Sequence, residues 1–560
     1  MPSHLWPPDV PFQRLVLSPE NPCQYCAGDL RICDHRHRDI QVFGGRLHLV
    51  CRLGQCKKDL CPMRHRTVSP ESEMGIAPPR LLVGWEPFAW IGHRRLAKDW
   101  RVAQIRDELH DSYQVELSVD SIEHYIARYQ AMLAAQAQDP LMLAEAYRGS
   151  AGVILSIDGL QPEKGHETLY VVRELTCKRV WFAVPLISGA AAEVARLLVQ
   201  AKEWAQRLDK PVLAWVSDKQ DAFVTGIAEL FPDVPHRYCA NHFLRDAARP
   251  MLDVDCHAKV QMRRKVRGLR EIERATLTTL RGETSEEPEH PEAPTGSLAP
   301  PTMPSTTQVA PPRASLVLDY CSAVRGVLND DQGGPIHPPG VRMAEALQEI
   351  RASLARIIAA PRADHDRTPF RRLAACIDRG LHCVAEALAT VREYAVKMAE
   401  VAACLDPANG EAKDRLALFE NLARAFHNAT DPVIVHMGKT MASFLPGLFV
   451  GAEIPGIPFD NLDLERAFRR PKGHQRHLHG HAHTGSKLVE EGPTLLPALD
   501  AHQRHPDLFK PEELAPHYLA QPPPCQKDAV HRRTIMRKAR SPKQRPVLLA
   551  SLEARFFEAC

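Results

Sequence analysis

Short runs of apolar and β-branched residues in the first half of the chain predict a mixed α/β sheet. Three of these runs follow one another with short connections: 152–160, 167–175 and 179–187. Such closely spaced strands are typical of an antiparallel meander. An amphipathic helix, a fourth apolar run at 211–219, a short helix and a last strand at 236–239 complete the pattern. The order of elements favours one sheet with helices packed on it.

A helical period of apolar residues precedes this sheet, over 94–135. The pattern is interrupted before Ser118, a residue type that commonly caps the start of a helix. Two helices joined by a short turn fit either a helix-turn-helix or an ordinary helical hairpin. In a helix-turn-helix, the second helix would present three side chains to the DNA major groove: Ser121, His124 and Arg128.

Downstream of the sheet the pattern becomes helical and then polar. Residues 313–430 are rich in Ala, Leu and Arg, without a convincing strand. The preceding segment, 283–312, contains eight prolines and almost no apolar residues, which predicts disorder. Residues 459–490 are polar and basic, and 527–545 hold eight Lys and Arg against one acid, which is typical of a solvated tail.

Composition and charge limit the classes of protein to which the chain can belong. The chain has 560 residues and a net charge of only +3, which excludes a uniformly basic packaging protein but not DNA binding by local patches. Its first residues do not resemble a signal peptide. No stretch reaches about 18 apolar residues, so we expect no membrane span. The fifteen cysteines are therefore expected in a reducing compartment, as metal ligands or free thiols.

Six of these cysteines lie within the first 61 residues, in a segment of short apolar alternations that predicts short strands. Two pairs have the spacing of a tetrahedral zinc site: Cys23 with Cys26, and Cys56 with Cys61. A hairpin between the pairs would bring the four thiolates to one Zn²⁺, as in a zinc ribbon. Three further residues are possible substitutes as ligands: Cys33, Cys51 and His65.

Two carboxylates stand at the ends of predicted strands. Asp158 follows an apolar run of five residues, and Asp218 follows another of six. A carboxylate is costly in or next to a buried strand unless it is hydrogen-bonded or bound to a metal. Taken singly, each is more often a turn residue. On neighbouring strands, however, the two acids and a third could hold two Mg²⁺ ions for phosphoryl transfer.

Three more groups of residues could take part in this chemistry. Cys239 and His242, just after the expected last strand, have the spacing of a ligand pair or of two packed side chains. The helical run 460–470 places Asn461 and Glu465 on one face among several arginines, either as part of an active site or as a salt-bridged surface helix. The five histidines within 474–483 could bind metal, but their basic neighbours favour a DNA-facing segment.

These motifs together resemble an insertion-sequence transposase of the DDE type. The resemblance is carried by SIDGLQPEKGHETLYVVREL, WVSDKQDAF, HRYCANHFLRD and NLDLERAFRRPKGHQRHLHG. It implies an RNase H-like catalytic domain with Asp158, Asp218 and Glu465 as the three acids that bind Mg²⁺ or Mn²⁺. Asp460 and Asp463 are alternatives to Glu465. Cys239 and His242 match a Cys-x-x-His found after the second acid in families related to Mutator and hAT elements.

The expected architecture is a multidomain α/β protein, in which an RNase H-like mixed sheet is interrupted by an all-helical insertion and preceded by a zinc ribbon and a helix-turn-helix. The expected parts are the zinc ribbon at 1–80, the helix-turn-helix at 90–140, the first part of the catalytic core at 151–250, the helical insertion at 251–455, the last part of the core at 456–500 and a basic tail at 501–560.

The resemblance also implies a function. A transposase binds the terminal inverted repeats of a mobile element, cuts them and joins them to target DNA, and it works on double-stranded DNA as at least a dimer. The expected location is the cytoplasm of a bacterial-type cell, at the nucleoid. Two alternatives remain: a DNA-binding regulator or inactive transposase remnant, and an RNase H-like nuclease or resolvase.

Overall fold

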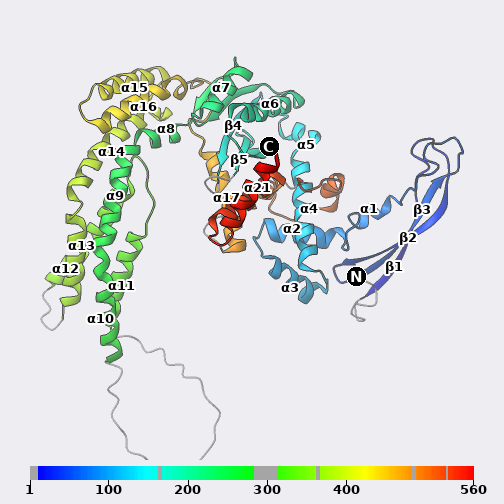
Figure 1. Cartoon of the computed structure of the whole chain (residues 1–560), viewed down its shortest axis with the longest axis horizontal. Helices are drawn as coiled ribbons and strands as arrows, with labels where there is room; N and C mark the ends of the chain where they lie inside the picture. The colour runs from blue at the N-terminus through cyan, green and yellow to red at the C-terminus, as the bar shows by residue number, and fades with distance from the viewer. Residues whose placement is uncertain are drawn as a thin grey trace, which may run out of the picture. The chain divides into compact units, whose positions relative to one another are not determined.

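A computed structural model describes residues 11–161, 167–282, 312–360, 366–480, 487–524 and 527–559. The chain is a mixed α/β protein with two sheets, divided into two compact units (Figure 1). The first unit comprises Met1–Arg237 and Ile454–Cys560, and the second comprises Tyr238–Glu453. Among the described residues, no helix has the length and apolar character needed to cross a bilayer.

The first sheet is a long β-ribbon. Strand β3 (Gly45–Cys56) pairs in parallel with β1 (Phe12–Leu17) and antiparallel with β2 (Leu30–Val42). A two-residue turn, in which Gly44 has a φ of 76°, joins β2 to β3. The expectation of short strands was wrong. Apolar residues alternate only near the β2–β3 turn, where Ile40 and Leu49 pack in a small core. Most of β2 is exposed and charged, so its sequence carries no such pattern.

Helices follow the ribbon and form much of the core of the first unit. They are α1 (Ser72–Ile76), α2 (Trp85–Leu96), α3 (Val102–Tyr113), α4 (Val119–Ala137) and α5 (Pro140–Ala146). The predicted cap of α4 is confirmed, since the Ser118 side chain accepts a hydrogen bond of 3.1 Å from the Ser121 N–H. After its first turn, most of α4 is buried. The helix packs against α2 and α18 (Lys487–Arg504).

The second sheet has five strands in the order β6-β5-β4-β7-β8. They are β4 (Val153–Leu160), β5 (Thr168–Glu174), β6 (Arg179–Leu186), β7 (Val212–Ser217) and β8 (His236–Tyr238). The first three strands are antiparallel, so the predicted meander is confirmed. Strand β7 pairs in parallel with β4, which the connecting helix makes possible.

Helices cover both faces of this sheet. Alternate residues of β4, such as Leu155 and Ile157, pack with α6 (Ala191–Arg207) and α7 (Asp221–Leu230). On the opposite face, strand residues such as Val171 and Val180 pack with α18 and with α17 (Leu462–His479). Because side chains alternate along a strand, this division also fixes which face each polar strand residue joins.

The second unit contains helices and no strand among its described residues, apart from the last residue of β8. Its elements are α8 (Ala240–Ala247), α9 (Arg249–Lys265), η2 (Val266–Gly268), α10 (Leu269–Gly282), α11 (Pro312–Leu328), α12 (Pro339–Ala359), α13 (Thr368–His382), α14 (Ala385–Leu405), η3 (Pro407–Asn409), α15 (Ala412–His427) and α16 (Pro432–Leu448). Helix α9 packs against α12, α13 and α14. The segment predicted to be disordered lies outside the described residues, except for Pro312.

The chain ends in further helices of the first unit: α19 (Pro511–Leu514), η4 (Ala515–His517), α20 (Lys527–Arg540) and α21 (Arg545–Ala559). The basic residues predicted to lie in a solvated tail are therefore mostly helical. Helix α20 packs against α21, and Arg533 of α20 forms an ion pair with Glu490 of α18. The high charge density of the segment concealed its helical propensity.

Candidate functional site

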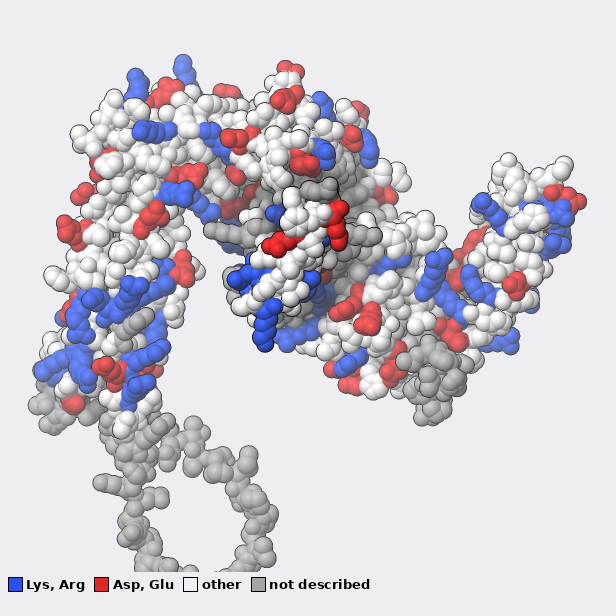
Figure 2. Space-filling model, in the orientation of Figure 1, with Lys and Arg blue, Asp and Glu red and all other residues white. Residues whose placement is uncertain are grey.

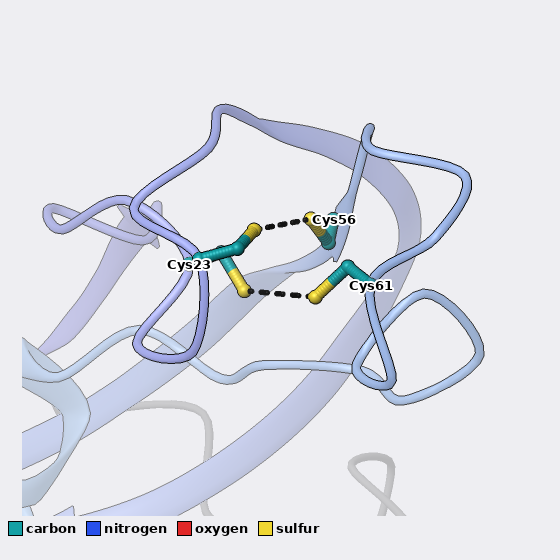
Figure 3. Close-up of side chains that lie close together, drawn as sticks. Cys23, Cys56 and Cys61 are labelled. Atoms are coloured by element: carbon teal, nitrogen blue, oxygen red, sulfur yellow. Dashed lines mark hydrogen bonds between the residues drawn. The ribbon is translucent and has the colours of Figure 1, made fainter.

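Four cysteines form one compact group at the end of the ribbon (Figure 3). The Sγ atoms of Cys23 and Cys61 are 3.7 Å apart, and those of Cys26 and Cys56 are 3.4 Å apart. All four sulfurs lie within 4.8 Å of one another. Four thiols at this spacing are the donor set of a structural zinc site. The group could therefore hold a metal such as Zn²⁺.

Local backbone geometry brings each pair of thiols together. Cys23 and Cys26 lie on a tight turn that Ala27 closes, with a φ of 50° and a hydrogen bond of 2.8 Å from its N–H to the Cys23 carbonyl. Cys56 is the last residue of β3, and Cys61 lies in the following turn. The β2–β3 hairpin thus carries the second pair back to the first.

The electrostatics of the thiols differ within the group. Hydrogen bonds from the backbone N–H groups of Cys26 and Tyr25 lower the pKa of Cys23 to about 7. Burial raises the pKa of Cys61 to about 12. The Cys23 thiolate therefore forms readily, whereas Cys61 needs a bound cation to lose its proton.

The three possible substitute ligands stand apart from this group. Cys33 is exposed and donates to the Leu53 carbonyl at 3.3 Å, and His65 is exposed. Cys51 is buried in the core at the base of the ribbon.

Asp158 lies inside β4 and not at its end, because β4 continues to Leu160, and Asp218 directly follows β7, the parallel neighbour of β4. The register pairs Ile157 of β4 with Ser217 of β7, so Asp158 and Asp218 are the next residues on the two strands. Asp158 also lies on the same face of the sheet as Ile154, because the two residues are separated by an even number of positions. Ala214 and Val216 pack with Ile154 there, and Asp218 continues their alternation. Both acids therefore belong to the face that α17 covers.

Helix α17 is attached to the strand that carries the first acid. Ser156 of β4 donates a hydrogen bond to the side-chain oxygen of Asn461, the residue before α17, and both side chains are fully buried. Glu465 follows one helical turn later, and its N–H donates to the Asn461 carbonyl at 3.1 Å. The Asn461 side chain thus lies toward β4, and Glu465 lies one helical turn further along α17.

The neighbouring acids of α17 have other partners. Asp463 accepts a hydrogen bond of 2.6 Å from Arg173 of β5, and Asp460 accepts one of 3.0 Å from the Leu462 N–H. Arg173 is itself buried and also donates to Asp500 of α18 at 3.0 Å. Burial alone would lower the pKa of Arg173, but the charges of Asp500 and Asp463 raise it.

Lys472 of α17 interacts electrostatically with two of the acids, Asp158 and Glu465. Burial and the charge of Arg476 lower its pKa, whereas the charges of Asp158 and Glu465 act in the opposite direction. Its ammonium group therefore lies within the field of both acids. The three acids are less tightly grouped than the thiols, since within the described part of the chain their ligand oxygens do not all fall within 4.8 Å of one another.

Cys239 and His242 lie at the start of the helical unit. Cys239 is buried and immediately precedes α8, where its carbonyl accepts a hydrogen bond of 3.1 Å from the Phe243 N–H. His242 is half-buried on the first turn of α8. The spacing of the motif therefore corresponds to one helical turn.

The expected DNA-facing residues of α4 are only partly exposed. His124 is exposed and Ser121 is half-buried, but Arg128 packs toward the C-terminal segment, where its guanidinium donates to the Tyr518 carbonyl. Arg128 thus has a partner within the chain, and a contact of its side chain with a DNA groove stays a prediction. Helical periodicity identified the apolar face of α4, but a chain segment almost 400 residues away covers part of its polar face.

Two basic residues after Glu465, Arg470 and His474, bind an acid of the same unit. Arg470 donates to both oxygens of Asp99 at 2.6 and 2.9 Å, and the buried His474 is 2.5 Å from the same carboxylate. Burial alone would raise the pKa of Asp99, but these bonds lower it to about 2. His474, the first histidine of the predicted DNA-facing segment, is therefore internal, whereas Arg476, His477 and His479 are exposed. His481 and His483 lie outside the described residues.

Basic side chains gather on the helical unit. Figure 2 shows Lys and Arg clustered over α10–α13. The Lys and Arg residues described as exposed on these helices and at the end of α9 are Arg264, Lys265, Arg270, Arg274, Arg342, Arg356, Arg371, Arg372 and Arg379. No local sequence pattern marks these residues as one surface, because they come from three separate segments.

The sequence was also compared with known proteins. No protein-family model matches the chain, and no curated protein matches it either.

Proposed function

We propose that the chain is a DDE-type DNA transposase with an RNase H-like catalytic core, in which Asp158, Asp218 and Glu465 bind the catalytic divalent metals. The observation that carries the proposal is the parallel pairing of β4 with β7, which sets two acids side by side at one sheet edge. The attachment of α17 to β4 through Asn461 supports Glu465 as the third acid.

The topology supports the RNase H-like core. An antiparallel meander whose first strand also pairs in parallel with the fourth is the arrangement expected from the resemblance. The helical unit lies in the sequence between the second and third acids, at Tyr238–Glu453. These features support the proposed division of the chain into a catalytic core and an insertion.

The donor set at the sheet edge fits the proposed metal. Carboxylate oxygens are the ligands that Mg²⁺ and Mn²⁺ prefer. Bound there, the metal would activate a water or a 3′-hydroxyl and stabilise the leaving oxygen of a DNA phosphate. The chain's own residues fix the two strand acids in register, hold α17 on β4 and place the cation Lys472 beside the carboxylates.

Local basic surfaces would provide the DNA contacts. The cluster over α10–α13 offers guanidinium and ammonium groups for phosphates, and such contacts give affinity without reading bases. On α4 the exposed His124 remains a candidate, but the exposed acids Asp120 and Glu123 on the same helix weaken the case for a recognition helix. Sequence-specific binding of the element ends is therefore assigned to the N-terminal region as a whole.

The test uses the full chain and a plasmid carrying the DNA that flanks its gene. With Mg²⁺, wild-type protein should cut the flanking DNA and join the 3′ ends to a target. Asp158→Asn, Asp218→Asn and Glu465→Gln should each reduce cutting at least a hundredfold, since each removes a metal ligand. Asp460→Asn is the matched control for Glu465 and should cut at a similar rate to wild type.

The outcome also separates the alternatives. A DNA-binding regulator would bind the flanking DNA without cutting it in any buffer that contains Mg²⁺ or Mn²⁺. A nuclease would cut without joining. Cutting that survives Asp158→Asn unchanged would refute the proposed role of the acids.

A further inference from the structure

Two histidines of the ribbon meet across strands β2 and β3. The register places Asp39 of β2 opposite His48 of β3, and His37 stands two positions before Asp39. Because alternate residues of a strand share a face, the three side chains lie on the same face of the sheet. His37 is exposed, and the side chain of His48 is 24% exposed. Neither imidazole is therefore enclosed by the core.

One ring nitrogen of each histidine faces the other. His37 Nδ1 lies 3.0 Å from His48 Nε2, and the ring centroids are 5.2 Å apart with 38° between the ring planes. Two nitrogens bound to one metal ion at about 2.0–2.1 Å stand about 2.8–3.4 Å apart, for ligand angles between square-planar and tetrahedral. The observed separation lies within that range, so small rotations of the two rings would let both nitrogens bind one ion.

Asp39 determines which nitrogen of His48 is available. Its carboxylate oxygen lies 2.5 Å from His48 Nδ1 and holds the ring proton on that nitrogen. His48 Nε2 therefore keeps its lone pair and accepts the hydrogen bond from His37 Nδ1. A carboxylate behind an imidazole is also the usual outer partner of a metal-bound histidine, whose ring it orients. The arrangement of Asp39 and His48 thus matches that of a histidine prepared for a metal.

We propose that His37 and His48 bind a divalent metal ion that prefers nitrogen ligands, such as Zn²⁺, and that Asp39 orients His48 for it. The ion would take the place of the proton between the two rings, which would move to Nε2 of His37. Imidazole suits Zn²⁺, Ni²⁺ and Cu²⁺, whereas Mg²⁺ prefers oxygen. Two protein ligands leave the other positions of the ion to water or to a donor on a bound partner. The site shares no residue with the thiol group and does not depend on transposase activity.

The experiment titrates Zn²⁺ into the full-length protein by calorimetry, after about one equivalent has filled the thiol group. Four thiolates bind Zn²⁺ far more tightly than two imidazoles, so the two events separate. Wild-type protein should then bind about one further equivalent, with a dissociation constant on the order of 10 µM. Because other histidines of the chain also bind Zn²⁺ weakly, the measured quantity is the difference between wild type and each variant.

Three variants and a control identify the ligands. His37→Ala and His48→Ala should each lose the further equivalent, because a single imidazole holds the ion at least roughly tenfold more weakly. Asp39→Ala should weaken binding by about ten- to a hundredfold, since His48 loses its orienting partner. His35→Ala is the matched control and should bind as wild type does. His35 is exposed on the same strand, but it stands opposite Arg52 and not His48.

Three results would overturn the proposal. The first is no further binding to folded wild-type protein at Zn²⁺ concentrations up to about 1 mM. The second is the same stoichiometry and affinity in wild type as in His37→Ala or His48→Ala, whichever of the two folds. The third is an equal loss in His35→Ala, which would show that Zn²⁺ binds exposed histidines without the pairing of His37 and His48. None of these results depends on whether the protein cuts DNA.

Discussion

The thiol group at the end of the ribbon and the acids at the edge of the second sheet are assembled in opposite ways. The four cysteines lie within 39 residues, and one hairpin brings both pairs together. The three acids span more than 300 residues and come from β4, from the residue after β7 and from α17. The thiols have little around them except one another, whereas the acid-bearing elements are held by buried polar contacts of the core.

The difference shows what stabilises each site. A short segment with a small core depends on its ligands, so binding of the metal and folding are the same event there. A sheet edge inside a large core is positioned by packing and hydrogen bonds whether or not a metal is bound. Removing the metal should therefore unfold the first site and leave the second intact.

The largest expected effect is on the thiol site. Purified protein should contain about one Zn²⁺ per chain, and Cys23→Ser or Cys56→Ser should lose it. Without zinc, the end of the ribbon should become sensitive to proteolysis. Metal analysis and limited proteolysis measure both. Cys33→Ser is the control and should keep the metal, since Cys33 is exposed and outside the group. A full zinc content in Cys56→Ser would contradict the assignment.

The next effect concerns the framework of the acids. Arg173→Met should lower the free energy of unfolding by about 1.5–3 kcal/mol, because the buried Asp500 would lose one of its two arginine partners and keep only Arg504. Urea denaturation measures the change. Arg196→Met is the control. Its ion pair with Glu193 is on the surface, so the loss should be below about 1 kcal/mol. Similar losses in the two variants would show that the buried ion pair does not hold α17 and α18 in place.

Much of the fold and of the two candidate sites could be predicted from the sequence. The features that could not be predicted have a common physical cause. Strand runs, the cap at Ser118 and the cysteine spacing are local signals, and each led to the correct element or group. The long ribbon was missed because its exposed strand has no apolar alternation. The partners of Arg128 and Arg470 were missed because they lie hundreds of positions away. No local pattern distinguishes an arginine that will bind a phosphate from one that will bind Asp99.

A smaller effect is expected from pH. Burial and the charge of His93 lower the pKa of His502 on α18 to about 3. The folded state therefore keeps His502 neutral, and its contribution to stability is complete above pH 6.5 and is lost as the pH falls toward 3. Between pH 6.5 and 5, wild type should lose about 1–2 kcal/mol more than His502→Gln. Urea denaturation across this pH range measures the free energy of unfolding of both proteins. An equal dependence on pH in the two would contradict the lowered pKa of His502.

The smallest effect is local to α4. Ser118→Ala should lower the free energy of unfolding by about 1 kcal/mol, because the first turn of α4 loses its cap. Ser121→Ala is the matched control, since it retains the backbone N–H that donates to Ser118. Thermal denaturation of the two variants gives the comparison, and a larger loss in Ser121→Ala would show that the cap is not the stabilising contact.

The most direct measurement of the central claim is anomalous X-ray diffraction from crystals of the full chain soaked in Mn²⁺. We predict anomalous peaks at the edge of the second sheet, about 2.1 Å from carboxylate oxygens of Asp158 and Asp218 and with Glu465 in the same coordination sphere. The same crystals of Asp158→Asn should lack at least one of these peaks. Well-diffracting wild-type crystals with no manganese at this edge, or with manganese bound equally in Asp158→Asn, would contradict the proposed catalytic site.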